Sequence, residues 1–505
     1  MPGGTGAELM TIAKGAGIGV GGTVVGSGFR YAFQVLAARS LGSELLGLFF
    51  LGFAVFKISR MIAELGLANG VVRYVALYNG VGDLGRVKGI VSLGTKWAAV
   101  SGLAVGVLLA LLARPLAIGL FARPELTLPL RLFAVALPFS AAGAMLLFAT
   151  QGFKVMKYQA LVREIFEPGL RLALAAAFFA LGMEIYGAVI ASVAPLILSP
   201  LPAWYYLKKL FPALRDRRLK PVYEAARLRS FSWPLLFVQF IGLAVLWTDT
   251  LMLGYFRTAG EVGIYVAAHK TALLGSVVIT SFAAIFGPVI SDFFNRREEQ
   301  DLRRSFQGVT KWILTFSLPI YLFLVFFRAP ILEIFGPEFT AGGSPLAILC
   351  LGWLVSSAIG PVGQMIIMTG RQKLHFLNMS GLMVINISLN LVLIPGYGIV
   401  GAAAATALSI SALSLAELWQ INRLLRIQPF RRDFLKPLAA GAVSLAALAG
   451  LERFAFELTG VAGLAAGFLL LAGFYTGIIL VLGLGPEDRI VLNRLKKRFF
   501  EKIPS

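Results

Sequence analysis

Gly182-Met-Glu-Ile-Tyr-Gly-Ala-Val-Ile-Ala-Ser192 and Gly396-Tyr-Gly-Ile-Val-Gly-Ala-Ala-Ala-Ala-Thr406 are two versions of one segment, and each begins a long apolar stretch. Four matches in register, these two segments included, indicate that two similar halves follow each other along the chain. All four pairs share an offset of about 214–218 residues; the other three are Glu44–Phe49 with Glu261–Tyr265, Asp83–Arg86 with Asp301–Arg304, and Thr150–Gly152 with Met368–Gly370.

The composition places both halves in a membrane. Of the 505 residues, 58% are apolar and only 14% are charged, and the mean hydropathy is +0.82. Soluble domains contain about 45–50% apolar and about 25% charged residues. We therefore predict an all-α polytopic membrane protein with about fourteen transmembrane helices. The predicted spans are 15–38, 44–68, 89–113, 125–150, 160–181, 185–207, 231–256, 262–288, 309–328, 342–369, 374–394, 398–422, 435–452 and 460–484.

The net charge of +21 follows from where the basic residues lie. Most of the 46 Lys and Arg residues fall in alternate connections between spans, above all in the linker 208–230. The positive-inside rule makes these connections cytoplasmic. We therefore expect the cytoplasmic (inner) cell membrane as the location, both termini in the cytoplasm, and no nucleic-acid partner. One cysteine and two histidines argue against a disulfide framework and against a Cys- or His-ligated metal site.

The duplication also predicts the domain organisation. We expect an N-lobe of six spans at 1–207, the basic cytoplasmic linker at 208–230 and a C-lobe of six spans at 231–424. Two extra spans follow at 425–484, and a basic cytoplasmic tail occupies 485–505. Parallel repeats of this kind build transporters whose substrate site lies between the halves.

Three turns of the chain resemble those of one known family, in the same order. The chain is similar there to the span 1–2, 7–8 and 11–12 regions of the polysaccharide transporter family, which contains the O-antigen (lipid-linked oligosaccharide) flippases. That family belongs to the multidrug/oligosaccharidyl-lipid/polysaccharide exporter superfamily. The three stretches are Ala38-Arg-Ser-Leu-Gly-Ser-Glu-Leu-Leu-Gly-Leu-Phe49, Asp249-Thr-Leu-Met-Leu-Gly-Tyr-Phe256 and Asn390-Leu-Val-Leu-Ile-Pro-Gly-Tyr-Gly-Ile-Val-Gly-Ala402.

The resemblance implies a flippase and not an enzyme. Such a protein moves polyprenyl-diphosphate-linked oligosaccharide from the cytoplasmic to the outer leaflet by alternating access of two six-helix lobes. It also implies contacts with membrane lipids and with glycan-assembly proteins, and we expect a functional monomer. We expect no cofactor other than a coupling ion, H⁺ or Na⁺. The related lipid II flippases also have fourteen spans, and their last two form a groove for the lipid tail.

Charged residues inside the spans are the candidate site residues. A charge at the bilayer centre costs about 2.5–3.5 kcal/mol, so each must face another charge, a wet cavity or the membrane edge. These residues are Arg30, Lys57, Arg60, Glu64, Lys96, Glu167, Arg171, Asp249, Lys270 and Glu417.

Four of the cations predict a diphosphate site. Arg30, Lys57, Arg60 and Lys270 lie on the first two spans of each half, so the duplication gives their helices equivalent positions. Gln34 lies on the same polar helix face as Arg30. Guanidinium forks and ammonium groups suit a ligand with two or more negative charges. We therefore predict a cationic cavity between the lobes; the structural alternative is a salt-bridge lattice that stabilises one conformer.

Two acids complete the candidate site. Asp249 is the lone acid deep in span 7, and we predict that it binds the coupling ion or pairs with Lys270 or Arg30. Glu64 is four residues from Arg60, a spacing that places both on one helix face and favours an ion pair. For both acids the structural alternative is a contact that only supports helix packing.

Two other functions remain open from the sequence. A multidrug or small-molecule antiporter of the same superfamily has a similar fold, although its cavity need not be so cationic. A membrane-embedded glycosyltransferase or polysaccharide polymerase needs clustered acids or histidines beside an outer loop, whereas the outward loops here are short. A basic cavity favours the flippase, a closed apolar pocket the antiporter, and an outer groove with clustered carboxylates the enzyme.

Overall fold

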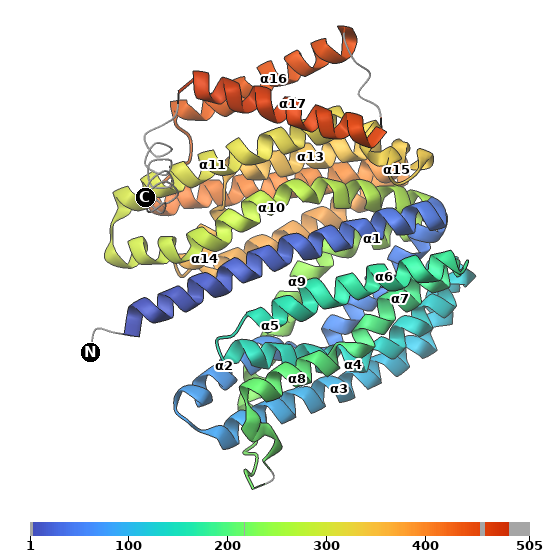
Figure 1. Cartoon of the computed structure of the whole chain (residues 1–505), viewed down its shortest axis with the longest axis vertical. Helices are drawn as coiled ribbons and strands as arrows, with labels where there is room; N and C mark the ends of the chain where they lie inside the picture. The colour runs from blue at the N-terminus through green and yellow to red at the C-terminus, as the bar shows by residue number, and fades with distance from the viewer. Residues whose placement is uncertain (1–3, 217, 455–459, 484–505) are drawn as a thin grey trace, which may run out of the picture. The chain divides into compact units, whose positions relative to one another are not determined.

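The computed structural model describes residues 4–216, 218–454 and 460–483, and the regular structure in these ranges is helical without any strand (Figure 1). The α-helices are α1 (Gly4–Ala63), α2 (Leu67–Gly80), α3 (Leu84–Arg114), α4 (Thr127–Gly152), α5 (Lys157–Gln159), α6 (Glu167–Ala180), α7 (Glu184–Leu198), α8 (Pro200–Leu210), α9 (Ala225–Phe256), α10 (Ala259–Arg296), α11 (Glu299–Phe326), α12 (Arg328–Glu333), α13 (Gly343–Ile359), α14 (Val362–Met368), α15 (Gln372–Leu425), α16 (Leu435–Phe454) and α17 (Gly460–Val481). The π-helices are η1 (Pro115–Leu120) and η3 (Ala160–Phe166), and the 3₁₀ turns are η2 (Pro124–Leu126), η4 (Pro212–Arg215), η5 (Pro337–Gly342) and η6 (Arg432–Phe434).

The predicted all-α membrane fold is confirmed. Among the described residues, 11 helical stretches are long and apolar enough to cross a membrane. Two of these each contain two predicted spans, because Gly42 in α1 and Gly398 in α15 have non-helical backbone angles that break the helix. The stretch 157–180 is interrupted by a π-helix and supplies one more span. The helices therefore agree with the prediction of about fourteen spans.

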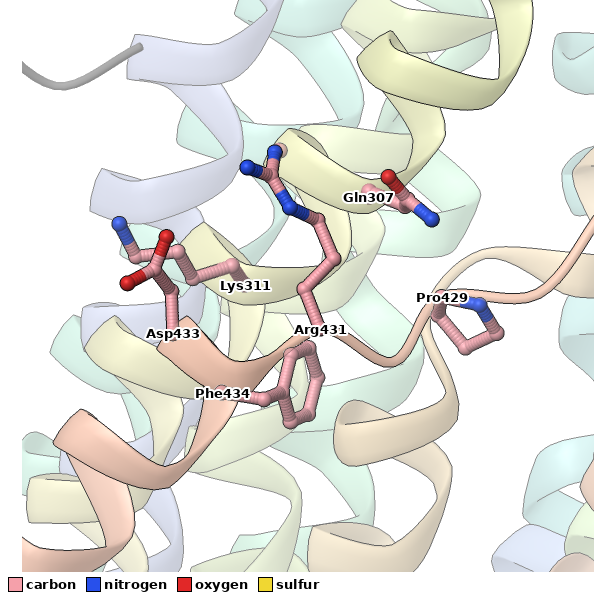
Figure 2. A pocket seen from close by; sticks show the side chains of 7 residues that line it. Gln307, Lys311, Pro429, Arg431, Asp433 and Phe434 are labelled. Atoms are coloured by element: carbon pink, nitrogen blue, oxygen red, sulfur yellow. The ribbon is translucent and has the colours of Figure 1, made fainter. Parts of the chain in front are cut away.

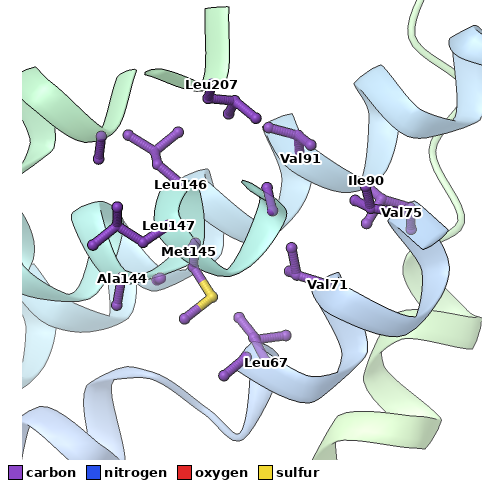
Figure 3. Packing of buried hydrophobic residues seen from close by; sticks show 14 of the residues in the cluster. Leu67, Val71, Val75, Ile90, Val91, Ala144, Met145, Leu146, Leu147 and Leu207 are labelled. Atoms are coloured by element: carbon purple, nitrogen blue, oxygen red, sulfur yellow. The ribbon is translucent and has the colours of Figure 1, made fainter. Parts of the chain in front are cut away.

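The first compact unit comprises Met1–Val266 together with Ile394–Ile399. One apolar core of this unit brings together α2, α3, α4 and α8, as Figure 3 shows. Buried side chains at Leu67, Val71, Ile90, Met145 and Leu207 fill this core. Helix α9 packs against α1 and α2 in the same unit. Four helices of the predicted N-lobe thus share one apolar core.

The second compact unit comprises Ala267–Leu393 and Val400–Ser505. One core joins α10, α11, α14 and α15, and another joins α16 and α17 to α11 through Leu318, Ala440 and Tyr475. The unit boundary lies within α10, whereas the duplication predicts a boundary in the linker. The compact units reflect which helices pack together, whereas the duplication reflects how the sequence repeats, so the two boundaries need not coincide. The predicted lobes remain a prediction. The predicted tail 485–505 lies outside the described residues.

The basic linker is tied to the α2–α3 end of the first unit. The Val222 amide donates to the Gly85 carbonyl oxygen at 3.0 Å, and Lys88 Nζ donates to the Asp216 carbonyl oxygen at 2.6 Å. Glu224 Oε1 lies 2.9 Å from Arg86 Nε, and Glu224 Oε2 accepts a 2.6 Å hydrogen bond from the Tyr78 hydroxyl. This hydrogen bond and the nearby guanidinium groups lower the pKa of Glu224. We call this set of contacts the linker clamp.

Candidate functional site

A cavity of about 470 Å³ lies within the first unit, among α1, η3, α6 and α9. Its apolar floor includes Met61, Leu243 and Leu246, and Gln239 adds an amide. Four basic and three acidic side chains line it: Arg30, Lys57, Arg60, Arg163, Glu64, Glu164 and Glu167. A cavity with this many charges inside membrane-spanning helices is suited to a charged ligand, because such charges are costly without one or without each other.

Local sequence explains how η3 comes to lie against α1. Pro168 has no N–H, so the carbonyl of Glu164 lacks the partner that an α-helix supplies four residues later. The helix widens there, and the Glu167 amide bonds back to the Val162 carbonyl in the π pattern. On α1, a Cβ at Gly26 would overlap the Glu164 carbonyl oxygen, so only glycine permits this approach. These features bring Glu164 to the cavity edge of α1.

Arg30 lies on α1 one turn beyond Gly26 and contacts η3. Its Nη1 forms a 2.8 Å salt bridge with Glu164 Oε2, and its Nη2 donates to Ser27 Oγ at 3.1 Å. The two charged side chains remain 41% and 27% exposed. The pair is therefore accessible from the cavity.

Arg60 and Glu64 form the ion pair that their spacing predicts. Arg60 Nε lies 2.9 Å from Glu64 Oε1, and the side chains are only 12% and 13% exposed. This pair is more buried than that of Arg30, and it lies within one stretch of chain at the end of α1. The spacing argument is confirmed here, whereas the substrate role of Arg60 and Glu64 remains a prediction.

The remaining cations around the cavity lie over aromatic rings. Lys57 Nζ is 4.9 Å from the centroid of the Phe53 ring, and the Arg163 guanidinium is 4.7 Å from that of Phe148. The Arg171 guanidinium, which is not part of the cavity lining, lies 5.4 Å from the centroid of the same Phe53 ring, so one ring contacts two cations. Such cation–π contacts stabilise a desolvated cation by about 2 kcal/mol. They hold positive charge at the cavity without neutralising it.

The other predicted site residues lie elsewhere. Gln34 is buried, and its Nε2 donates to the Val266 carbonyl oxygen at 3.4 Å. Asp249 is 2% exposed and accepts a 2.6 Å hydrogen bond from the Tyr265 hydroxyl. Lys270 is partly buried on the part of α10 that belongs to the second unit. The roles of Gln34, Asp249 and Lys270 remain predictions.

Sequence reasoning missed part of the cavity. Neither Arg163 nor Glu164 is among the charged residues that the sequence places inside the spans, and Glu167 is among them without a predicted role in the cavity. The available signal was Pro168, four residues after Glu164. A proline inside a span leaves a backbone carbonyl without its hydrogen bond and often alters the helix.

The second unit has a much smaller pocket, shown in Figure 2, between α11 and the segment that leads into α16. Its lining includes Gln307, Lys311, Arg431 and Asp433, and Gln307 Nε2 donates to the Gln428 carbonyl oxygen at 3.0 Å. The volume of about 10 Å³ is that of a single water-sized sphere. We assign no ligand to this pocket. Nowhere in the described ranges do three or more His, Cys, Asp or Glu side chains form a group that could hold a metal ion.

Comparisons with known proteins agree with this fold. The chain is 28% identical over 200 residues to the probable low-salt glycan biosynthesis flippase Agl15 of Haloferax volcanii, a match that covers 38% of the chain and 41% of that relative. It is 22% identical to an uncharacterized membrane protein of Methanocaldococcus jannaschii, with 82% of the chain and 85% of that protein covered. The chain thus spans well under half of the first relative and most of the second.

A solved structure has the same fold. The lipid II flippase MurJ in an inward closed conformation matches with a TM-score of 0.74 and 16% sequence identity, over 91% of this chain and 97% of that chain. The MatE family matches residues 234–392, which agrees with the predicted superfamily. The family described as polysaccharide biosynthesis protein matches residues 12–294, more than half of the chain. The predicted family resemblance is therefore confirmed, and this chain belongs to the polysaccharide biosynthesis protein family.

Proposed function

We propose that this chain is a flippase that moves polyprenyl-diphosphate-linked oligosaccharide from the cytoplasmic to the outer leaflet by alternating access. The observation that carries the proposal is the cavity of the first unit, where Arg30, Lys57, Arg60 and Arg163 face one space. A diphosphate has two or more negative charges, and arginine binds its oxygens with a bidentate fork. The cationic lining fits the diphosphate that joins the oligosaccharide to the polyprenyl chain in the proposed substrate.

The relatives support this proposal. Agl15 is named as a probable flippase of glycan biosynthesis, and MurJ as a flippase of lipid II. Both names are those of flippases, one of glycan biosynthesis and one of lipid II. The proposed direction of transport, from the cytoplasmic to the outer leaflet, depends on the predicted orientation, in which the basic linker is cytoplasmic.

The alternatives fit the cavity less well. The MatE match keeps the antiporter within the same superfamily, but seven charged side chains line the cavity of the first unit beside its apolar floor. A glycosyltransferase needs clustered acids beside an outer loop, whereas the three acids of this cavity lie among four cations. We therefore retain the antiporter as the second candidate.

Asp249 is our candidate for the residue that binds the coupling ion. It is buried in α9, and Tyr265 on α10 donates to one of its two carboxylate oxygens. A buried acid in a membrane-spanning helix is a functional candidate, because its charge is costly there. Binding of H⁺ or Na⁺ would remove that charge.

Binding of a short diphosphate tests the function directly. We expect the purified chain to bind farnesyl diphosphate in calorimetric titration more tightly than farnesyl monophosphate. Lys57→Gln and Arg60→Gln should each weaken binding by roughly 10- to 150-fold, the range for a hydrogen bond to a charged group. Equal binding of mono- and diphosphate, or variants that bind like the wild type while folded, would reject a diphosphate site in this cavity.

A further inference from the structure

We propose that Glu164 is a built-in competitor of the substrate: it pairs with Arg30 when no diphosphate is bound, gives way to the diphosphate, and pairs again to release it. This inference rests on the proposed function, because it concerns how the same cavity binds and releases its anion. It adds Glu164 as a positioning residue that acts through Arg30.

The geometry of the pair makes exchange feasible. Arg30 Nη1 contacts Glu164 Oε2 at 2.8 Å, while Nη2 is held by Ser27 Oγ at 3.1 Å. The guanidinium is thus oriented by its own helix and does not depend on Glu164 for its position. Carboxylate and phosphate oxygens bind the same edge of a guanidinium. A diphosphate that enters the cavity therefore meets an oriented fork whose partner it can replace.

The backbone at Glu164 is fixed while its side chain can rotate. The π-helical turn and the close approach of the Glu164 carbonyl to Gly26 hold the main chain against α1. Single π-helical turns occur frequently at functional sites. The glutamate side chain has three rotatable bonds and is 27% exposed, so it can leave Arg30 without movement of either helix.

The Arg60–Glu64 pair is the contrasting case in the same cavity. Its side chains are only 12% and 13% exposed, and the two residues are four apart. Breaking a buried pair is far more costly than breaking a solvated one. The Arg30 side chain is 41% exposed, about three times as much as that of Arg60. Arg30 is therefore the cation that exchanges partners.

The net charge of the cavity lining explains why this exchange of partners would favour both binding and release. With all groups charged, the four cations and three acids of the lining sum to about one positive charge, too few for a diphosphate with two or more negative charges. Rotation of Glu164 away from Arg30 removes one repulsive partner while the diphosphate is bound. Its return supplies a competing anion for release. Tight binding and release are thus obtained in one cavity.

Substitution of Glu164 separates affinity from turnover. We expect Glu164→Gln to tighten farnesyl diphosphate binding about two- to fivefold, the value of a partly solvated salt bridge. Flipping of a fluorescent lipid-linked sugar in proteoliposomes should slow at saturating substrate, because release loses its competitor. Glu164→Asp keeps the charge on a shorter side chain and should give the same changes to a smaller extent.

Glu167→Gln is the matched control. It removes the same charge from the same cavity, but among the described residues Glu167 forms no salt bridge with Arg30, so it should tighten binding less. In an Arg30→Ala background, Glu164→Gln should tighten binding no more than Glu167→Gln does. Unchanged or weaker binding by folded Glu164→Gln and Glu164→Asp, or equal tightening by Glu167→Gln, would overturn the competitor role alone. A wild-type chain that does not bind farnesyl diphosphate would instead overturn the proposed function.

Discussion

Arg30 and Arg60 line one cavity but differ in what their removal costs. Arg60→Ala leaves Glu64, which is only 13% exposed, without its partner, and about 3–5 kcal/mol, the cost of removing one partner of a fully buried pair, is the upper limit of the loss. Arg30→Ala breaks a solvated pair, which typically contributes about 0–1 kcal/mol. We therefore expect Arg60→Ala to lower the apparent Tm of the purified chain more than Arg30→Ala. An Arg60→Ala/Glu64→Ala chain should regain part of the loss; an equal Tm for both single variants would contradict this ranking.

Gly26 and Gly28 provide a second comparison at the residue scale. A Cβ at Gly26 would overlap the Glu164 backbone, whereas a Cβ at Gly28 meets no atom within 4 Å. We expect Gly26→Ala to destabilise the chain by about 1–3 kcal/mol, the usual cost of overpacking, and to slow flipping because η3 moves away from α1.

Gly28→Ala is the control for this substitution. It should leave the apparent Tm unchanged or raise it, since alanine favours a helix by about 0.5–1 kcal/mol over glycine. Melting curves and flipping rates of the two variants give the measurement. If both substitutions had the same effect, the close approach of η3 to α1 would not matter for the cavity.

At the scale of elements, the linker clamp gives the most direct prediction. Glu224 bonds to Tyr78 and Arg86, and its pKa is lowered. A lowered pKa means that the carboxylate stabilises the clamp above its ordinary pKa of about 4.3. That contribution is lost as the pH falls through the lowered value. We expect Glu224→Gln to speed hydrogen exchange of the segment 211–224 at neutral pH, and the difference from the wild type to vanish in acid.

The exposed pair of Asp292 and Arg296 is the control for the clamp. These side chains are 54% and 61% exposed on α10. Asp292→Asn should therefore leave exchange in the segment 211–224 unchanged. Protection of that segment that survives Glu224→Gln at neutral pH would show that the backbone contacts alone hold the linker.

The sequence predicts those elements whose cause is local. Apolar length predicts the spans, Gly42 and Gly398 lie in or beside turns recognised from motifs, and the spacing of Arg60 and Glu64 predicts their pair. The Arg30–Glu164 pair joins residues 134 positions apart, and it depends on the π turn before Pro168. No periodicity carries that information. The cavity was therefore half predicted: its cations on α1 were recognised, and η3 was not.

For the whole molecule, the orientation in the membrane is the first expectation to check. The basic linker predicts that Arg218 is cytoplasmic and that Glu125, in the connection before α4, is outside. In a Cys350→Ala background, Arg218→Cys should resist an impermeant maleimide in intact cells and react after permeabilisation. Glu125→Cys should react without permeabilisation. The opposite pattern would reverse the orientation and with it the proposed direction of transport.

The most direct test of the central claim is leaflet exchange of a fluorescent lipid-linked sugar in proteoliposomes, with and without H⁺ and Na⁺ gradients. We predict that the wild-type chain moves the label between leaflets and that a chain with Arg30, Lys57 and Arg60 each changed to Gln, folded by its melting curve, does not. Label that moves no faster with the wild-type chain than in empty liposomes, or equally fast with the triple variant, would contradict a cationic-cavity flippase.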